Sequence, residues 1–389
     1  SADFDLHDSR FSPVGSQEEP ELADRLFQQA TARVLGAANS VGLSIQREDL
    51  LQYGVNECHA IARHDEMDSV SKAQHAMQLI ESICDPELTA LAPQITSALI
   101  DGSDTPDFNF SLADNLDKER LRARDMLFSG QVDQALETAE AAVRQMDQRF
   151  AANPGVPRYF NSYAERVVYN RLFATMDERT VLIPDNLFYA HMELADVLGQ
   201  LKGAKASIDH LNAMVAYAPA YPLSHLKLAI QLARLEDWDS ARAACLNALR
   251  VALDRDDAAF AYYRFAYAEW MLDRFDTAVA AYIMSDHIAP GAIGSLESEL
   301  QELVARADSQ CIRVPENVDE AARVLASHDL PVWPHIEVAD IVRDAARVCV
   351  DEGMFVPART LSVAAARMND GEGDNIDMIQ AQFLRSLSA

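Results

Sequence analysis

Glycine and proline are scarce in this chain, with 14 and 15 residues among 389. Turn-rich β folds depend on both residues, so their scarcity argues against a sandwich or a barrel. Alanine and leucine, which favour helices, are abundant instead. Because 49% of the residues are hydrophobic, a chain of this length can form a large core, and we expect a helical array or two domains.

Long apolar runs and paired cysteine motifs are also missing. No run approaches the roughly 18 residues that a membrane-spanning helix needs, and residues 1–5 lack the basic and apolar stretches of a signal peptide. The five cysteines are widely spaced and form no C-x-x-C motif. This usage favours reduced thiols packed as small apolar residues, and therefore a cytoplasmic location.

Basic residues are few compared with acidic ones. The chain has 33 basic and 61 acidic residues, and its formal net charge is -28. Residues 1–117 carry -15 of this excess. A surface of this sign repels phosphate groups, so we expect neither a nucleic-acid partner nor an anionic membrane partner. It would favour basic partners, although a merely solvated surface explains the same charge.

Signatures of catalysis and cofactor binding are absent from the sequence. It contains no G-x-S-x-G elbow, no H-E-x-x-H helix and no glycine-rich phosphate loop in a suitable context. The nearest grouping of metal-binding residue types is Cys58, His59 and His64, but that spacing does not place both histidines on one helix face. We therefore expect no catalytic residue, no metal ion and no cofactor.

The first third of the chain divides into three segments. Residues 1–20 are polar and predict a disordered lead. Residues 21–100 contain apolar residues at helical spacing and predict an N-terminal helical segment. Residues 101–117 are acidic and rich in turn-forming residues, so they predict a linker.

A two-helix pattern repeats over residues 118–389, and its clearest copy spans 259–292. Large and small residues alternate in a fixed order along both helices of this copy: Tyr262, Phe265, Ala266, Ala278, Tyr282 and Ser285. Ala266 and Ala278 have almost no side chain, so the two helices can approach closely there. Pro290 ends the copy because proline does not continue a helix.

Further copies place similar residues in the same slots. Trp238 and Phe275 are 37 residues apart, and Phe355 occupies this slot in a later copy. Each follows a short polar turn. The remaining copies centre on small residues or on a helical run, namely Ala135 and Ala142, Phe188 to Pro219, Val318 to Arg323, and Ala346 and Ala358.

This pattern resembles the tetratricopeptide repeat (TPR) family over about 118–385, with a degenerate stretch at 153–187. The resemblance implies an all-α fold, a TPR-like α-solenoid of stacked antiparallel helix pairs after an N-terminal helical segment. Glu269 departs from the family, which prefers an aromatic residue there, and spacings of 37 and 43 exceed the usual 34 or so. A generic alanine-rich bundle is the alternative. We expect more than about 65% helix and no sheet.

In this family the first helix of each repeat lines a concave groove that binds protein segments. The groove positions of two consecutive copies carry three cations and three aromatic residues: Lys227, Arg234, Tyr263, Arg264, Tyr267 and Trp270. Arginine can pair with a carboxylate, and tyrosine or tryptophan can bury an apolar anchor. The alternative is that the three rings pack against an adjacent helix.

The resemblance therefore implies a non-catalytic scaffold that holds a protein or peptide segment. Two other functions remain open. One is a signalling-peptide receptor or regulator coupled to the helices of 21–100, and the other is an enzyme on a helical scaffold. A cleft with convergent polar groups of perturbed ionisation would favour the enzyme. The sequence defines neither the partner nor the oligomeric state.

Overall fold

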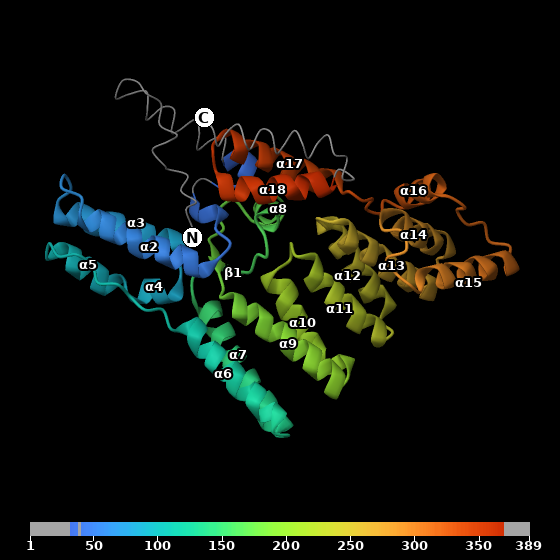
Figure 1. Cartoon of the computed structure of the whole chain (residues 1–389), viewed down its shortest axis with the longest axis horizontal. Helices are drawn as coiled ribbons and strands as arrows, with labels where there is room; N and C mark the ends of the chain where they lie inside the picture. The colour runs from blue at the N-terminus through green and yellow to red at the C-terminus, as the bar shows by residue number, and fades with distance from the viewer. Residues whose placement is uncertain (1–31, 38–39, 369–389) are drawn as a thin grey trace. The chain divides into compact units, whose positions relative to one another are not determined.

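A computed structural model describes residues 32–37 and 40–368, and about 73% of these are helical (Figure 1). This confirms the predicted all-α class and its packing of neighbouring helices in pairs. The predicted lead, 1–20, lies outside the described residues. Within the described part, no helix has the length and apolarity required to cross a membrane.

The chain forms two compact units. Unit 1 contains Ser1–Asn161 and Phe173–Leu194, and unit 2 contains Ser162–Leu172 and Ala195–Ala389. This division does not fall at the predicted linker, 101–117. The linker is also shorter than expected, because its last residues already belong to a helix, α6.

Unit 1 consists of helices joined by short connections, together with one small sheet. The helix α2 packs against α3, α3 packs against α5, and α6 and α7 form an antiparallel pair. The elements are η2 (Ser40–Leu43), α2 (Arg47–Ala62), α3 (Ser69–Ile83), α4 (Pro86–Ala90), α5 (Ala92–Ile100), α6 (Leu112–Phe128), α7 (Val132–Ala152), β1 (Val156–Arg158), β2 (Thr180–Leu182) and the first part of α9 (Asp185–Leu201).

The sheet corrects the prediction that the chain contains none. The strands β1 and β2 pair in parallel, with Val156 opposite Thr180, inside the degenerate stretch 153–187. Gly155 permits this pairing because its φ is +98° and a Cβ there would lie 2.7 Å from the carbonyl oxygen of Arg179. The repeat pattern fails here because the chain leaves the helical conformation.

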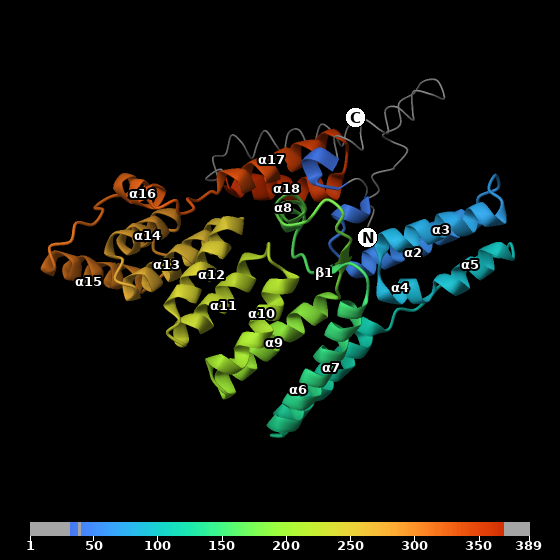
Figure 2. The ribbon, with the colours of Figure 1, turned by 180° about the vertical axis from the view of Figure 1, so that it is seen from behind.

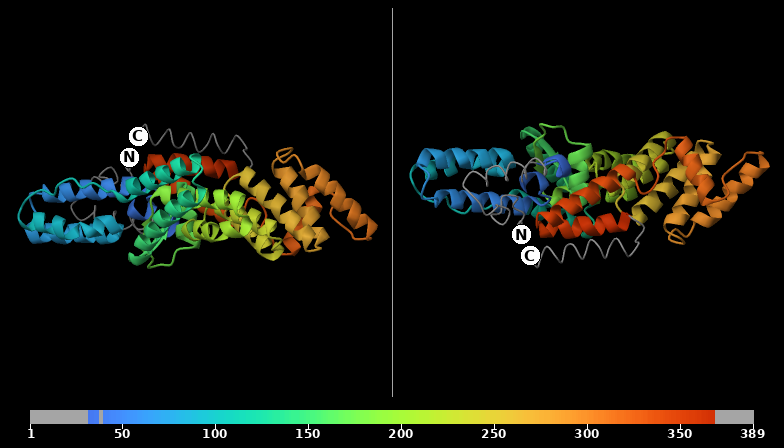
Figure 3. Two further views of the ribbon diagram at one scale, coloured as in Figure 1. Left: turned by 90° about the horizontal axis from the view of Figure 1, so that it is seen from below. Right: turned by 90° about the horizontal axis from the view of Figure 1, so that it is seen from above.

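Unit 2 continues with paired helices, which Figure 2 shows from behind. The pairs are α11 with α12, α13 with α14, and α17 with α18, while α16 packs against α14 and α8 against α17. Figure 3 shows α17 and α18 side by side. The elements are α8 (Tyr163–Leu172), the end of α9, α10 (Ala204–Tyr217), α11 (Pro222–Arg234), α12 (Trp238–Val251), α13 (Arg255–Met271), α14 (Phe275–Ile288), α15 (Leu296–Ser309), α16 (Val318–Ser327), α17 (Ile336–Asp351) and α18 (Phe355–Met368).

The five cysteines are free thiols, as their spacing predicted. Four of them, Cys58, Cys84, Cys245 and Cys349, are buried, and Cys311 is exposed. Burial raises the pKa of Cys58 to about 11, and that of Cys245 and Cys349 to about 12.

Four helix pairs close with the same turn. The residue two positions before each second helix has a left-handed backbone, with φ of 80° at Gly130, 57° at Glu236, 59° at Asp273 and 70° at Gly353. The next amide donates to the carbonyl five residues back, as Asp237 does to Leu232 at 3.0 Å. This is the Schellman motif, which satisfies carbonyl groups at the end of the first helix.

Glycine has no side-chain penalty at this turn position, whereas glutamate does. We expect Glu236→Gly to raise the free energy of unfolding by about 0.5–1 kcal/mol. We expect Gly130→Ala to lower it by about 1 kcal/mol through backbone strain alone, because no atom lies within 4 Å of the added methyl group. Urea unfolding measures both changes, and a destabilised Glu236→Gly variant would contradict the turn assignment.

The two alanines at which the helices of the clearest copy were predicted to cross are buried, and α13 and α14 pack against each other. Ala266 on α13 and Ala278 on α14 are fully buried. Ser285 Oγ donates to the carbonyl of Ala259 at 2.6 Å, which joins the same two helices by a buried hydrogen bond. Close packing at the crossing therefore leaves no room for a larger side chain.

We expect Ala278→Leu to lower the free energy of unfolding by about 1–3 kcal/mol through overpacking. The matched control is Ala243→Leu, because Ala243 lies on the exposed face of α12 and should change stability little. Thermal and urea unfolding measure the difference. Equal midpoints for Ala278→Leu and the unsubstituted chain would contradict this crossing.

Glu269 is buried in place of the aromatic residue that the resemblance implies. Its carboxylate accepts hydrogen bonds from Arg242 Nε on α12 at 2.5 Å, from Arg274 Nη1 at 3.2 Å and from Thr277 Oγ1 on α14 at 2.5 Å. A buried carboxylate is stable only when it is paired and hydrogen-bonded. Glu269 therefore joins α12, α13 and α14 through polar contacts, whereas an aromatic residue at this position would join them through apolar contacts.

Candidate functional site

The six residues predicted for a binding patch lie on two helices of unit 2, with Lys227 and Arg234 on α11 and the other four on α13. Lys227 Nζ pairs with Asp196 at 2.9 Å, and Arg234 Nη1 donates to Gln231 at 3.1 Å. Both cations remain partly or fully accessible. Their contacts are surface pairs, which contribute little stability and can be exchanged for a ligand.

Arg264 is the half-buried cation of this group. Its guanidinium carbon lies 5.3 Å from the ring centroid of Phe260 and 5.9 Å from that of Tyr263. Within the described part of the chain, Arg264 has no ion pair, and its Nε is buried without a hydrogen-bond partner. A guanidinium in this state retains its capacity to bind a carboxylate.

The aromatic residues of the predicted patch differ in accessibility. Trp270 is only 6% exposed, and the guanidinium carbon of Arg306 on α15 lies 5.6 Å from its ring centroid. The expectation that Trp270 offers an open ring is therefore corrected, because a neighbouring helix covers it. Tyr267 is half-buried, and its ring meets that of Trp238 edge-on at 5.5 Å.

The same neighbouring helix, α15, also contacts Tyr263. Its hydroxyl lies 2.8 Å from Ser295 Oγ and donates a short hydrogen bond to Glu299 on α15. Burial, followed by the Glu299 carboxylate, raises the pKa of Tyr263, so the hydroxyl stays protonated. The patch members other than Trp270 are not buried, and we call the four that make no hydrogen bond to α15 or its first turn the α11–α13 face: Lys227, Arg234, Arg264 and Tyr267.

A second candidate site, which the sequence reasoning missed, is a cavity of about 220 Å³ in unit 1. Segments from α2, α6 and the start of α9 form it. Its lining residues are Gln46, Arg47, Glu48, Ala113, Asp114, Asp117, Arg120, Pro184, Asp185, Asn186 and Tyr189. The lining therefore contains four carboxylates and two guanidinium groups.

Asp185 is the half-buried carboxylate of this cavity. Burial raises its pKa to about 6, and the negative charges of Glu48 and Asp49 add to the shift. Asp185 also begins α9, where the helix dipole favours a negative charge. Desolvation and like charges outweigh that effect here.

Hydrogen bonds fix the opposite wall of the cavity. Asn186 Nδ2 donates to the carbonyl of Ala113 at 2.7 Å and to Asp117 at 3.0 Å. Arg120 Nη1 donates to Asp117 at 2.9 Å, and the other nitrogens of Arg120 bond to Glu193. Asp117 and Arg120 are thus held by partners before any ligand enters.

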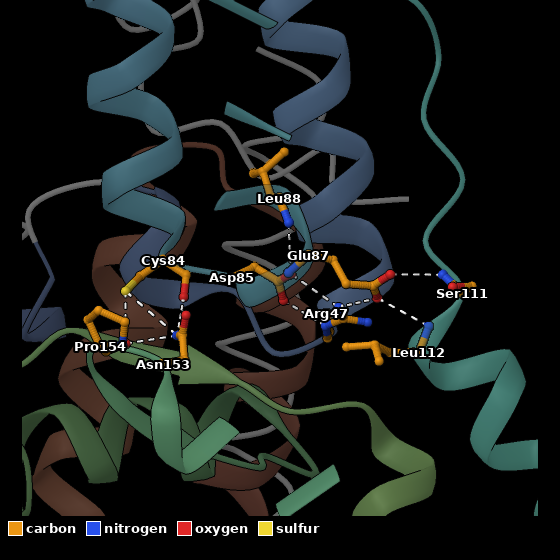
Figure 4. Close-up of polar contacts among 9 residues, drawn as sticks. All are labelled: Arg47, Cys84, Asp85, Glu87, Leu88, Ser111, Leu112, Asn153 and Pro154. Carbon is orange, nitrogen blue, oxygen red and sulfur yellow. Dashed lines mark hydrogen bonds and ion pairs between the residues drawn. The ribbon is translucent and has the colours of Figure 1, made fainter. Parts of the chain in front are cut away.

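Arg47, which is 4% exposed, also lines the cavity. Figure 4 shows its polar contacts. Its Nε donates to Asp85 at 2.7 Å, and its Nη2 donates to Asp85 at 3.1 Å and to Glu87 at 2.8 Å. Glu87 accepts in turn from the amides of Ser111 and Leu112 at 2.9 and 3.3 Å. These amides begin α6, so the buried ion cluster joins α2, α4 and α6.

The other contacts in Figure 4 lie where α3 and α7 end. Asn153 Nδ2 donates to the carbonyl of Cys84 at 2.7 Å and to that of Pro154 at 2.8 Å. Cys84 has a left-handed backbone with φ of 58°, and its thiol donates to Pro154 at 3.0 Å. These bonds satisfy carbonyl groups at the ends of both helices.

No protein-family model matches this chain, and no curated protein is similar to it. The fold defines an all-α protein with a helical-repeat arrangement. Membership of the TPR family therefore remains a prediction that rests on the repeat residues described above.

We expect Arg47→Met to lower the free energy of unfolding by about 3–5 kcal/mol, because Asp85 and Glu87 would be left buried without their cation. Methionine keeps much of the volume. The control is Arg63→Met, since Arg63 is 73% exposed and lies 3.5 Å from Asp104; it should change stability by less than about 0.5 kcal/mol. Urea unfolding at neutral pH compares the two. Similar free energies of unfolding for Arg47→Met and Arg63→Met would contradict a stabilising role for the cluster.

Proposed function

We propose that this chain is a non-catalytic scaffold that binds a protein or peptide segment on the α11–α13 face. The observation that supports this function is the half-buried guanidinium of Arg264, which is packed on aromatic rings without an ion pair in the described structure. The repeat pattern adds support, because helical arrays commonly bind partners along their first helices.

The chemistry of the face favours a ligand with a carboxylate next to an apolar group. Arg264 can form two parallel hydrogen bonds with a carboxylate, and Lys227 adds a second positive charge. Tyr267 offers part of an aromatic ring for the apolar group. The net charge of -28 repels such a ligand at long range, so added salt should speed association.

An enzyme is the second candidate, because the cavity of unit 1 combines convergent polar groups with a shifted pKa at Asp185. A general acid or base also needs a reacting partner within reach. The lining contains no serine, cysteine, histidine or lysine, and the carboxylate of Asp185 accepts no hydrogen bond from the described residues. These features favour binding over catalysis, and the free thiols are consistent with a proposed cytoplasmic location.

We expect the double variant Arg264→Ala with Tyr267→Ala to lose partner capture, because it removes the free cation and the accessible ring together. The measurement is affinity capture from native cell extract followed by mass spectrometry. The control is Arg250→Ala with Lys205→Ala, two exposed cations on other helices of unit 2. Circular dichroism should show unchanged helix in both.

Capture by the Arg264 and Tyr267 double variant at the level of the unsubstituted chain would place the binding surface elsewhere. Loss of capture in the Arg250 and Lys205 control would mean that overall charge, not this face, governs binding. Trp270→Ala is unsuitable as a test, because the ring is buried and its removal would destabilise the fold.

A further inference from the structure

We propose that the cavity of unit 1 binds the side chain of an arginine residue in a basic peptide, with Asp185 as the principal partner of the guanidinium group. This site lies in a different unit from the α11–α13 face and takes a ligand of opposite charge. The proposal therefore goes beyond the proposed function and does not depend on it.

Uncompensated negative charge is the first support. Glu48 and Asp114, which are exposed, and the half-buried Asp185 line the cavity, and their carboxylates form neither an ion pair nor a hydrogen bond within the described residues. The two cations of the lining are already used, because Arg47 binds Asp85 and Glu87, and Arg120 binds two carboxylates. A cation from outside would supply the missing partner.

The size of the cavity is the second support. Its volume of about 220 Å³ is below the roughly 300–1,000 Å³ of sites for drug-sized ligands and cofactors. One long side chain fits this space better than a nucleotide or a folded segment does. Most of its lining residues are also polar or charged, as a charged group requires when it leaves water.

Tyr189 favours arginine over lysine. Its ring lines the cavity and is 40% exposed, and its hydroxyl lies 3.1 Å from that of Tyr159. A planar guanidinium can stack on a fixed aromatic ring and bond to a carboxylate through two donors, whereas an ammonium group cannot do both equally well. Asn186 and Asp117 are held in place, so little ordering is needed on binding.

Binding should depend on pH because the carboxyl group of Asp185 must be ionised. The charged groups around it are Glu48, Asp49 and Arg47 on α2, and Asp114, Asp117 and Arg120 on α6. The acidic residues disfavour its ionisation, and a bound cation favours it. Affinity for a guanidinium group should therefore rise from about pH 5 to about pH 7.5, with release of a proton on binding near pH 6.

The experiment is isothermal titration calorimetry of the full chain with N-acetyl-L-argininamide at low salt. The neutral control is N-acetyl-L-citrullinamide, which has nearly the same shape without the charge. We expect heat of binding with the arginine compound and none with the citrulline compound, and binding at least about tenfold weaker for the lysine analogue. Equal binding of the citrulline compound or the lysine analogue would overturn the proposal.

Two further probes distinguish the source of the group. An arginine flanked by glycines in a blocked peptide should bind at least as tightly as the amide. Free L-arginine should bind more weakly, because its carboxylate meets the acidic lining. Tighter binding of free L-arginine than of the blocked peptide would overturn the assignment to a peptide side chain.

Variants test the residues directly. Asp185→Asn should weaken binding of N-acetyl-L-argininamide by about tenfold or more and remove its pH dependence near pH 6. Glu48→Gln should weaken it by a smaller factor, and provides a second test if Asp185→Asn fails to fold. Asp209→Asn, an exposed charge of unit 2, and Arg264→Ala should leave binding unchanged. Unchanged affinity in both Asp185→Asn and Glu48→Gln would overturn the site.

Discussion

The packing of paired helices, joined in four pairs by a left-handed turn, is the constraint on which both units depend. In α13 and α14 the small residues Ala266 and Ala278 have no exposed surface, so the two helices can pack closely there. The turn then fixes the direction of the second helix through a hydrogen bond over five residues. Once the crossing and turn are set, the larger residues on each face determine which helix packs next.

Buried polar clusters also hold helices together in both units, in addition to the packing of helix pairs. In unit 1 the buried Arg47 joins three helices through Asp85 and Glu87, and Arg47 also lines the cavity. In unit 2 the buried Glu269 does the same for α12, α13 and α14. Such clusters are stable only when all members are present, so they select one arrangement of helices and penalise alternatives. The candidate site of unit 1 thus depends on a structural ion cluster for its shape.

The sequence predicted the helical class and several helix pairs, because local spacing determines both. The polar turns before Trp238 and Phe275 were visible as short acidic or basic breaks, and the structure has helices that begin at those residues. The sheet at Val156 was missed because three residues give no readable alternation. The sequence left open whether Trp270 is accessible or packs against an adjacent helix, because its burial depends on α15, whose position no local pattern encodes. The cavity of unit 1 combines segments that are far apart in the sequence. Its lining could not be predicted, because no local pattern around Asp185 indicates which other segments lie beside it.

The distribution of thiols makes the chain suitable for labelling at a single position. Cys311 is exposed just after α15, whereas the other four cysteines are buried, and burial raises the pKa of three of them, which leaves little thiolate for reaction. A maleimide dye or spin label should therefore attach at Cys311 without any prior cysteine replacement. Its place beside the helix that covers Trp270 makes it a reporter for movement of α15. The fold thus supplies one reactive thiol at the end of α15 for spectroscopic labelling.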